Sequence, residues 1–169
     1  NALGARLAVD HLVHRGRRRI ATITGPLDLM AGRERLLGYQ EGLEAVGLAP
    51  DPALVVNGDF SLPSGEAAMR QLMVRSPDID AVFCANDLMA AGALRVLHEA
   101  RRRVPADVAV VGFDDSPQAL STHPQLTSVH QSPERMGREM VALLLQLLAD
   151  PDAAESRILP THLVVRSST

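Results

Sequence analysis

The sequence contains no lysine and no tryptophan, and its only aromatic residues are one tyrosine and three phenylalanines. All 17 basic residues are therefore arginine, and against 20 acidic residues they leave a net charge of −3. This balance excludes a strongly basic nucleic-acid binder, which needs net or clustered positive charge to neutralise phosphates. The single cysteine, Cys84, excludes an internal disulfide and fits a reducing compartment, so we expect a cytoplasmic protein.

No hydrophobic run approaches the roughly 18 residues of a membrane span, and no basic segment with an apolar core opens the chain. We therefore expect no membrane partner. No secretion signal is visible in these residues, and a segment before Asn1 could carry a targeting signal or another domain. The sequence begins at Asn1 and enters a helical pattern at once, so we expect it to be a piece of a longer protein. A length of 169 residues with 46% apolar residues predicts one ordinary globular domain.

Short β-branched segments alternate with stretches of helical periodicity. Strands are expected at residues 20–24, 54–56, 80–84 and 108–113, and two short ones at 157–159 and 163–166. Helices are expected at residues 3–13, 31–46, 64–75, 88–100 and 133–148. Strands separated by helices predict an α/β fold in which a parallel sheet lies between two helical layers. Residues 115–126 are expected to form a long irregular segment of functional importance.

Polar and aromatic side chains follow four of the predicted strands. They are Arg33 and Arg35, Phe60, Asn86 and Asp87, and Asp114 and Asp115. Ligands of open parallel sheets bind at the carboxyl ends of the strands, so this set predicts a binding mouth.

Each of these residues also has a structural interpretation. We favour Asp87 as a helix N-cap, and Asn86 could be a turn residue. An Asx turn at Asp114 and Asp115 is as consistent with the sequence as ligand binding. Arg33 and Arg35 could be solvated.

Signals for catalysis are weak. The sequence has no glycine-rich phosphate loop, nucleophile elbow or HExxH pattern, and Cys84 lies in an apolar strand, where packing is the favoured role. His11 and His14 could ligate a metal, but solvated histidines are the favoured interpretation. The arginine runs at 15–19 and 101–103 follow helices and are expected to complement helix dipoles rather than contact nucleic acid. We expect no enzyme activity and no cofactor.

Several segments together resemble one known family. They are Gly25-Pro26, Arg35-Leu36-Leu37-Gly38-Tyr39, Ala85–Leu94, Val104–Asp115, Pro124–Gln131 and Arg166–Thr169. In order and over almost the whole chain, they are similar to the effector-binding domains of lactose-repressor-type (LacI/GalR) bacterial transcriptional regulators. The segment from Asp107 to Asp115 is the most specific.

The resemblance implies a two-lobed sensor of the periplasmic-binding-protein-like type I fold, preceded by a helix-turn-helix domain that these residues do not include. By similarity, residues 1–127 form the C-terminal lobe. Residues 128–154 form a crossover strand and helix that would join the missing N-terminal lobe, and residues 155–169 return to the C-terminal lobe. DNA would be bound only through the missing N-terminal domain.

The resemblance also implies the functional residues. Arg35, Asn86, Asp114 and Gln131 are expected to contact a small-molecule effector, and Phe60 is expected to stack on it. A sugar suits this set, because arginine donates in a planar fork and aspartate accepts two hydroxyl protons.

Two further expectations accompany this assignment. The alternative function is a sugar-binding protein of a membrane transport system. The helix at 133–148 is too apolar to face water on more than one side. It should either fold back onto its own lobe or pack against a second copy, so we expect a homodimer.

Overall fold

A computed structural model describes residues 1–150 and 156–169. Six strands form one sheet: β1 (Ile20–Thr24), β2 (Val55–Asn57), β3 (Ala81–Cys84), β4 (Ala109–Asp114), β5 (Thr127–His130) and β6 (His162–Val164). The helices are α1 (Ala2–His14), α2 (Met30–Ala45), α3 (Leu62–Arg75), α4 (Asp87–Glu99), α5 (Pro117–Ser121) and α6 (Pro133–Ala149), with a short 3₁₀ helix, η1 (Pro52–Leu54).

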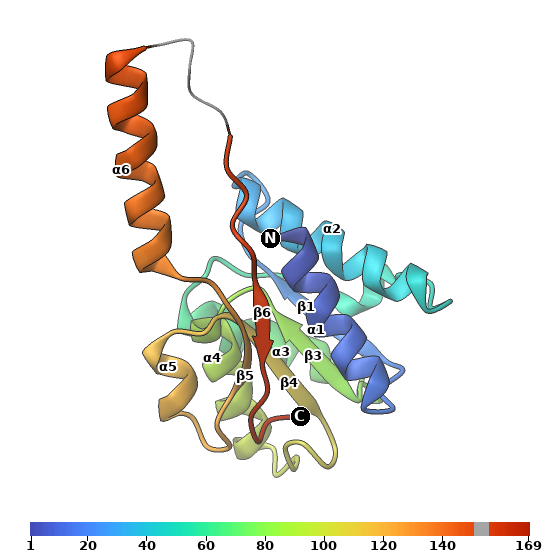
Figure 1. Ribbon diagram of the computed structural model, residues 1–169. Helices are drawn as coiled ribbons and strands as arrows, with labels where there is room; N and C mark the ends of the chain where they lie inside the picture. Colours follow the sequence, from blue (N-terminus) through green and yellow to red (C-terminus); the bar gives the residue numbers. More distant parts are fainter. Residues whose placement is uncertain (151–155) are drawn as a thin grey trace.

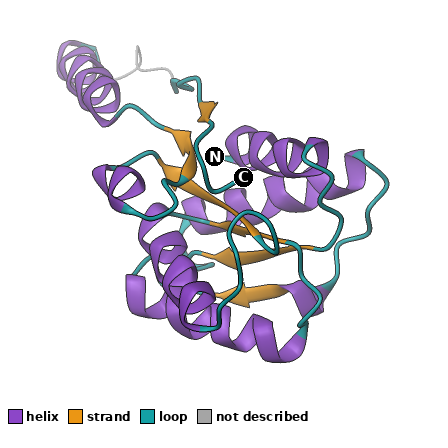
Figure 2. Ribbon diagram, turned by 90° about the horizontal axis from the view of Figure 1, so that it is seen from below, coloured by secondary structure: helices purple, strands orange, loops and turns teal. Residues whose placement is uncertain are grey.

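The strand order is β2-β1-β3-β4-β5-β6, in which β1 to β5 are parallel and β6 runs antiparallel beside β5. Helices α1 and α2 cover one face of the sheet, and α3 and α4 cover the other (Figure 2). The predicted α/β architecture, a mostly parallel sheet between two helical layers, is confirmed.

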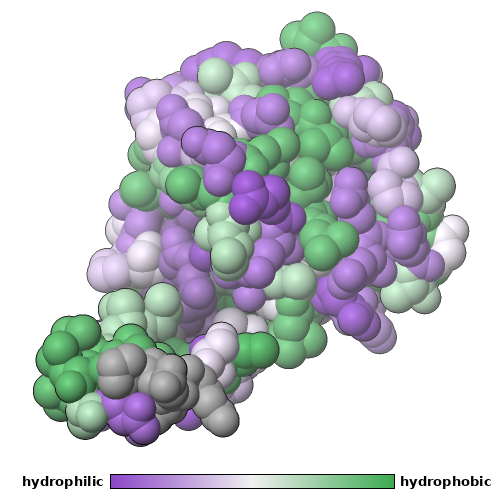
Figure 3. Space-filling model, turned by 90° about the horizontal axis from the view of Figure 1, so that it is seen from above, coloured by the Kyte–Doolittle hydropathy of each residue, from purple (hydrophilic) through white to green (hydrophobic). Residues whose placement is uncertain are grey.

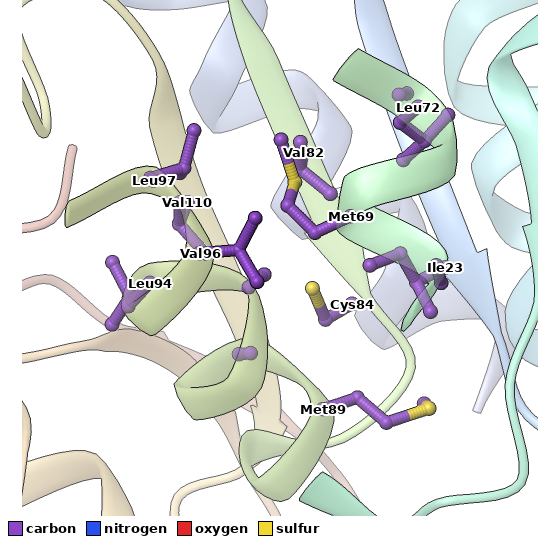
Figure 4. Close-up of a cluster of buried hydrophobic side chains, with 14 of the residues drawn as sticks. Ile23, Met69, Leu72, Val82, Cys84, Met89, Leu94, Val96, Leu97 and Val110 are labelled. Carbon is purple, nitrogen blue, oxygen red and sulfur yellow. The ribbon is translucent and has the colours of Figure 1, made fainter. Parts of the chain in front are cut away.

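Two hydrophobic clusters hold the layers together. The cluster under α3 and α4 packs Met69, Leu72, Met89 and Leu97 against strand residues such as Val82 (Figure 4). The other places Tyr39, from α2, and Phe83 and Phe113, from the sheet, beneath α1 and α2. Because both faces of the central strands are covered, these strands are buried along almost their whole length and consist mainly of apolar residues, as expected of a buried parallel sheet.

The predicted strand at 157–159 is wrong. β5 ends at His130, which pairs with His162, so residues before 162 meet no neighbouring strand. Arg157 instead forms an ion pair with Glu139 and donates a hydrogen bond to Gln146, both on α6. The segment at 115–126 is less irregular than expected, since it contains the short helix α5.

Helix α6 extends away from the lobe (Figure 1). None of its residues is buried, so the structure does not show it folding back onto its own lobe. Its exposed large apolar side chains are Met136, Met140, Val141, Leu144, Leu145, Leu147 and Leu148. Figure 3 shows hydrophobic residues on the projecting part of the molecule at the lower left. Over residues 1–150 and 156–169, no helix is long and apolar enough to cross a membrane.

Candidate functional site

Arg35, in the second turn of α2, lies beneath the carboxyl ends of the strands. It donates to the Ala85 carbonyl oxygen at 2.5 Å and to Asn1 Oδ1 at 3.1 Å, and its Nη1 lies 3.2 Å from Asp114 Oδ1. Its guanidinium carbon is 3.8 Å from the centroid of the Phe113 ring. Only 6% of Arg35 is exposed, so the solvated interpretation is wrong. Burial lowers the pKa of Arg35, and Asp114 opposes this effect by stabilising the cation.

Asp114 is the last residue of β4 and joins Arg35 to Gln131. Its Oδ1 accepts a hydrogen bond from Gln131 Nε2 at 2.8 Å, in addition to the contact with Arg35. No described residue donates to Oδ2, and 38% of the side chain is exposed. Burial raises the pKa of Asp114, although Arg35 and the hydrogen bond from Gln131 favour the charged form. Asp114 Oδ2, on a partly exposed side chain, is therefore the oxygen that could accept from a further donor.

Asn86 is the N-cap of α4, because its Oδ1 accepts a hydrogen bond from the backbone N–H of Met89 at 2.9 Å. The prediction that Asp87 caps this helix is therefore wrong. The Asn86 amide also donates from Nδ2 to the Phe60 carbonyl oxygen at 2.9 Å. This hydrogen bond connects the residues that follow β3 with the loop after β2.

Phe60 lies in the loop after β2, beside the carboxyl end of the neighbouring strand β1. Its backbone is left-handed, with φ of 70°, and a Cβ atom on Gly25 would lie 2.1 Å from its ring. Glycine at position 25 therefore makes room for the aromatic ring over the end of β1. The Arg35 guanidinium carbon lies 5.9 Å from the ring centroid. Phe60 thus supplies an apolar wall beside the polar cluster.

Asp115 contacts His130, the last residue of β5, and Arg166, which follows β6. Its Oδ1 accepts from Arg166 Nη2 at 2.6 Å, and its Oδ2 lies 3.0 Å from His130 Nδ1. An Asx turn at Asp114 needs the Ser116 N–H, which donates to Asp87 instead, and Pro117 has no N–H for a turn at Asp115. The Asx-turn interpretation is therefore wrong. Arg33 is not in the cluster, because it is exposed and donates to the backbone of Leu27 and Asp28.

Sequence reasoning named Asp87 but missed its burial and its hydrogen-bond partners. Asp87 is 1% exposed and accepts hydrogen bonds from Ser116 and Ser128. The signal that could have found it is Gly112, a glycine in the middle of an apolar strand, which marks a close approach. A Cβ atom there would lie 2.3 Å from Asp87 Oδ1.

The remaining candidates lie away from this cluster. His11 Nε2 is 2.8 Å from Thr169 Oγ1, and the described residues contain no group of three potential metal ligands. The Arg19 side chain pairs with Asp78 at 2.8 Å, and Asp80 accepts from the backbone N–H groups of Arg18 and Arg19. Cys84 is fully buried, and burial raises the pKa of its thiol, as expected of a packing residue.

The geometry defines a class of protein, an α/β binding domain with a polar site at the exits of β3, β4 and β5. Comparison with known proteins agrees. Residues 9–169 match the model of the periplasmic binding protein-like domain family. The chain belongs to this family, and the relatives that it matches are LacI-type transcriptional regulators.

Two relatives illustrate the match. The HTH-type transcriptional regulator CelR of Thermobifida fusca is 53% identical over 99% of this chain and 50% of its own length. The ribose operon repressor of Escherichia coli K12 is 37% identical over 96% of this chain and 49% of its own length. The chain thus spans about half the length of the curated relatives it matches.

Solved structures show the same fold. A complex of CelR with cellobiose superposes with a TM-score of 0.96 at 53% identity, over 99% of this chain and 52% of that one. A lac repressor dimer bound to operator and an anti-inducer gives 0.92 at 35% identity, over 99% and 50%. Because these relatives are transcriptional regulators, the transport alternative is not favoured.

Proposed function

We propose that this chain is the part of a LacI-type regulator that senses a small-molecule effector and forms a homodimer, and that the effector is a sugar. The observation that carries the proposal is the cluster of Arg35, Asp114 and Gln131 at adjacent strand exits. Arg35 and Gln131 both contact one oxygen of Asp114, and no described residue donates to the other. Such an oxygen can accept hydrogen bonds from the neighbouring hydroxyl groups of a sugar.

Two neighbours complete the proposed contact surface. The Phe60 ring can cover the apolar face of a pyranose, and Asn86 lies between this ring and the start of α4. The similarity to CelR, which is known in complex with cellobiose, makes a glucose disaccharide the first effector to try. Effector contacts by Arg35, Phe60, Asn86, Asp114 and Gln131 remain part of this proposal.

The wider assignment follows from the same family relationship. We assign residues 1–127 to one lobe, residues 128–154 to a crossover into a second lobe, and residues 155–169 to the return. DNA contact belongs to a segment outside these 169 residues, in a cytoplasmic protein that catalyses no reaction and has no membrane partner.

The test is calorimetric titration of the full-length protein with cellobiose, other neutral sugars and nucleosides. Saturable binding of a sugar supports the proposal. A transport function would instead be supported by a secretion signal upstream of Asn1 in the gene, where a regulator has a helix-turn-helix segment. Binding of nucleosides in place of every sugar would overturn the proposed effector class.

A further inference from the structure

Asp87 is a buried carboxylate that does not cap the helix that contains it. Helix α4 is already capped by Asn86. Asp87 is 1% exposed, and no described arginine or histidine forms an ion pair with it. A carboxylate buried without a cation costs stability unless hydrogen bonds satisfy it. The contacts of Asp87 therefore indicate what it does.

All of its hydrogen bonds lead to the segment just after Asp114. Oδ2 accepts from the Ser116 backbone N–H at 2.7 Å and from the Ser116 hydroxyl at 2.9 Å. Oδ1 accepts from the Ser128 hydroxyl at 2.6 Å, and Ser128 Oγ in turn accepts from the Asp115 N–H at 3.1 Å. Asp87 thus holds the two peptide N–H groups that follow Asp114, one directly and one through Ser128.

This segment has an unfavourable backbone. Asp114 has φ of 100° and Asp115 has φ of 54°, a left-handed conformation that non-glycine residues rarely adopt. The direction of the Asp114 side chain depends on this conformation, since the Cα–Cβ bond turns with the backbone. Holding the next two N–H groups keeps Asp114 directed at Arg35 and Gln131.

The neighbouring strand is adapted to Asp87. A Cβ atom on Gly112 would lie 2.3 Å from Asp87 Oδ1, so β4 has no side chain where the carboxylate passes. Glycine in a strand interior loses packing and costs conformational entropy. The sheet therefore accommodates Asp87 at a cost to its own stability, which favours a role in the site over a role in folding.

We propose that Asp87 is a positioning residue of the effector site, which orients Asp114 through Ser116 and Ser128 without touching the effector. This inference rests on the proposed function, because it assumes that Asp114 binds the effector. It predicts that removing the Ser128 hydroxyl weakens effector binding more than removing the Ser116 hydroxyl. Ser128→Ala removes the link to the Asp115 N–H, whereas Ser116→Ala removes only a hydroxyl and leaves the backbone contact in place.

The experiment is a series of effector titrations on the full-length protein with cellobiose as the probe. Asp87→Asn places an amide donor, N–H₂, where Oδ1 or Oδ2 now accepts hydrogen bonds. It should therefore weaken effector binding by about 10-fold or more. Ser128→Ala should weaken it by about 3- to 10-fold, and Ser116→Ala by less. Ser76→Ala is the matched control, because Ser76 is also buried but its hydroxyl has no described partner.

A double-mutant cycle separates positioning from general stability. In an Asp114→Ala background the effect of Asp87→Asn or Ser128→Ala on affinity should fall to less than about 2-fold, because the residue that they orient is gone. Effects that add fully to that of Asp114→Ala would overturn the inference. If Asp87→Asn does not fold, the Ser128→Ala cycle decides by the same criterion.

The two proposals fail differently. An unmodified protein that binds no sugar contradicts the proposed function, and the positioning role with it. Sugar binding that is unchanged by both Asp87→Asn and Ser128→Ala contradicts only the positioning role.

Discussion

Asp114 has two carboxylate oxygens in different environments, one shared by Arg35 and Gln131 and one to which no described residue donates. Asp114→Ala should weaken effector binding by about 1.5–3 kcal/mol, the range for a hydrogen bond to a charged group. Calorimetric titration of the full-length protein measures the loss. Unchanged affinity would remove Asp114 from the site.

Arg35 is held on several sides, by the Ala85 carbonyl, Asp114 and the Phe113 ring. Arg35→Lys keeps the charge but removes the planar guanidinium that can donate in several directions and stack on the ring. We expect weaker effector binding, by about 10-fold, since one or two hydrogen bonds are lost. Arg33→Lys is the control on the same helix, because Arg33 is exposed and lies outside the cluster. Equal effects of the two substitutions would contradict the role of Arg35.

Acid should weaken binding at a higher pH than an ordinary aspartate would require. Burial raises the pKa of Asp114 in the free protein. A ligand that donates to the carboxylate prefers its charged form, so affinity is present above this pKa and is lost as the pH falls through it. Titrations across the mildly acidic range measure the loss, and in Asp114→Asn this dependence should flatten.

The contribution of Asp114 to the stability of the free protein depends on pH with the opposite sign to its contribution to effector affinity. Because the folded-state pKa is raised, the contribution of Asp114 to stability is present at low pH and is lost as the pH rises through that pKa. Affinity and the stability contribution of Asp114 should therefore change with opposite signs in this pH window. A loss of affinity that is identical in Asp114→Asn would assign the titration to another group.

At the scale of elements, the helices α3 and α4 approach closely through glycine. A Cβ atom on Gly65 would lie 2.3 Å from the Met89 carbonyl oxygen, which is backbone and cannot move aside cheaply. Gly65→Ala should therefore destabilise the fold by about 1–3 kcal/mol through overpacking. Urea denaturation followed by circular dichroism measures the change.

Gly137, on α6, is the matched control. A Cβ atom there would have no neighbour within 4 Å, so alanine adds only its better helix propensity. Gly137→Ala should increase helix stability by about 0.5–1 kcal/mol. If both substitutions shift the urea midpoint in the same direction, close packing does not explain Gly65.

Most of the sheet could be predicted from sequence because strands buried on both faces are short runs rich in apolar and β-branched residues, as at residues 20–24 and 81–84. Arg35 and Asp114 could be predicted to lie close together because each follows or ends a parallel strand, and the carboxyl ends of these strands meet at one edge of the sheet. The role of Asp87 could not be predicted in this way. An aspartate beside a helix start has the same local pattern whether it caps the helix or binds serines 29 and 41 residues away.

Residues 157–159 show a second limit of sequence reasoning. Their composition suits a strand, but a strand needs a partner, and β5 has already ended at His130. Pairing depends on register between segments far apart in the chain, which local patterns do not contain. The failure at 157–159 and the missed role of Asp87 both involve contacts between distant segments.

At the scale of the whole molecule, α6 has an apolar surface that the described part of the chain leaves exposed. Its exposed apolar residues include Met140, Leu144, Leu147 and Leu148. Burying one such side chain is worth about 1.5–3 kcal/mol, so several exposed together favour association. We expect the 169-residue chain to form a homodimer at micromolar concentration, with α6 packed against a second copy. Light scattering measures the mass, and a strictly monomeric 18.1 kDa species contradicts the dimer.

The double substitution Leu144→Asp and Leu147→Asp tests whether α6 itself makes the contact. Both side chains are exposed on α6, so the change should not disturb the core of the lobe. Charge on this surface must be desolvated on association, so the population should shift to monomer. The matched control is Val74→Asp, since Val74 is an exposed apolar residue on α3. A dimer that persists in the α6 variant would place the contact on another surface, and the long apolar helix would then need a different partner.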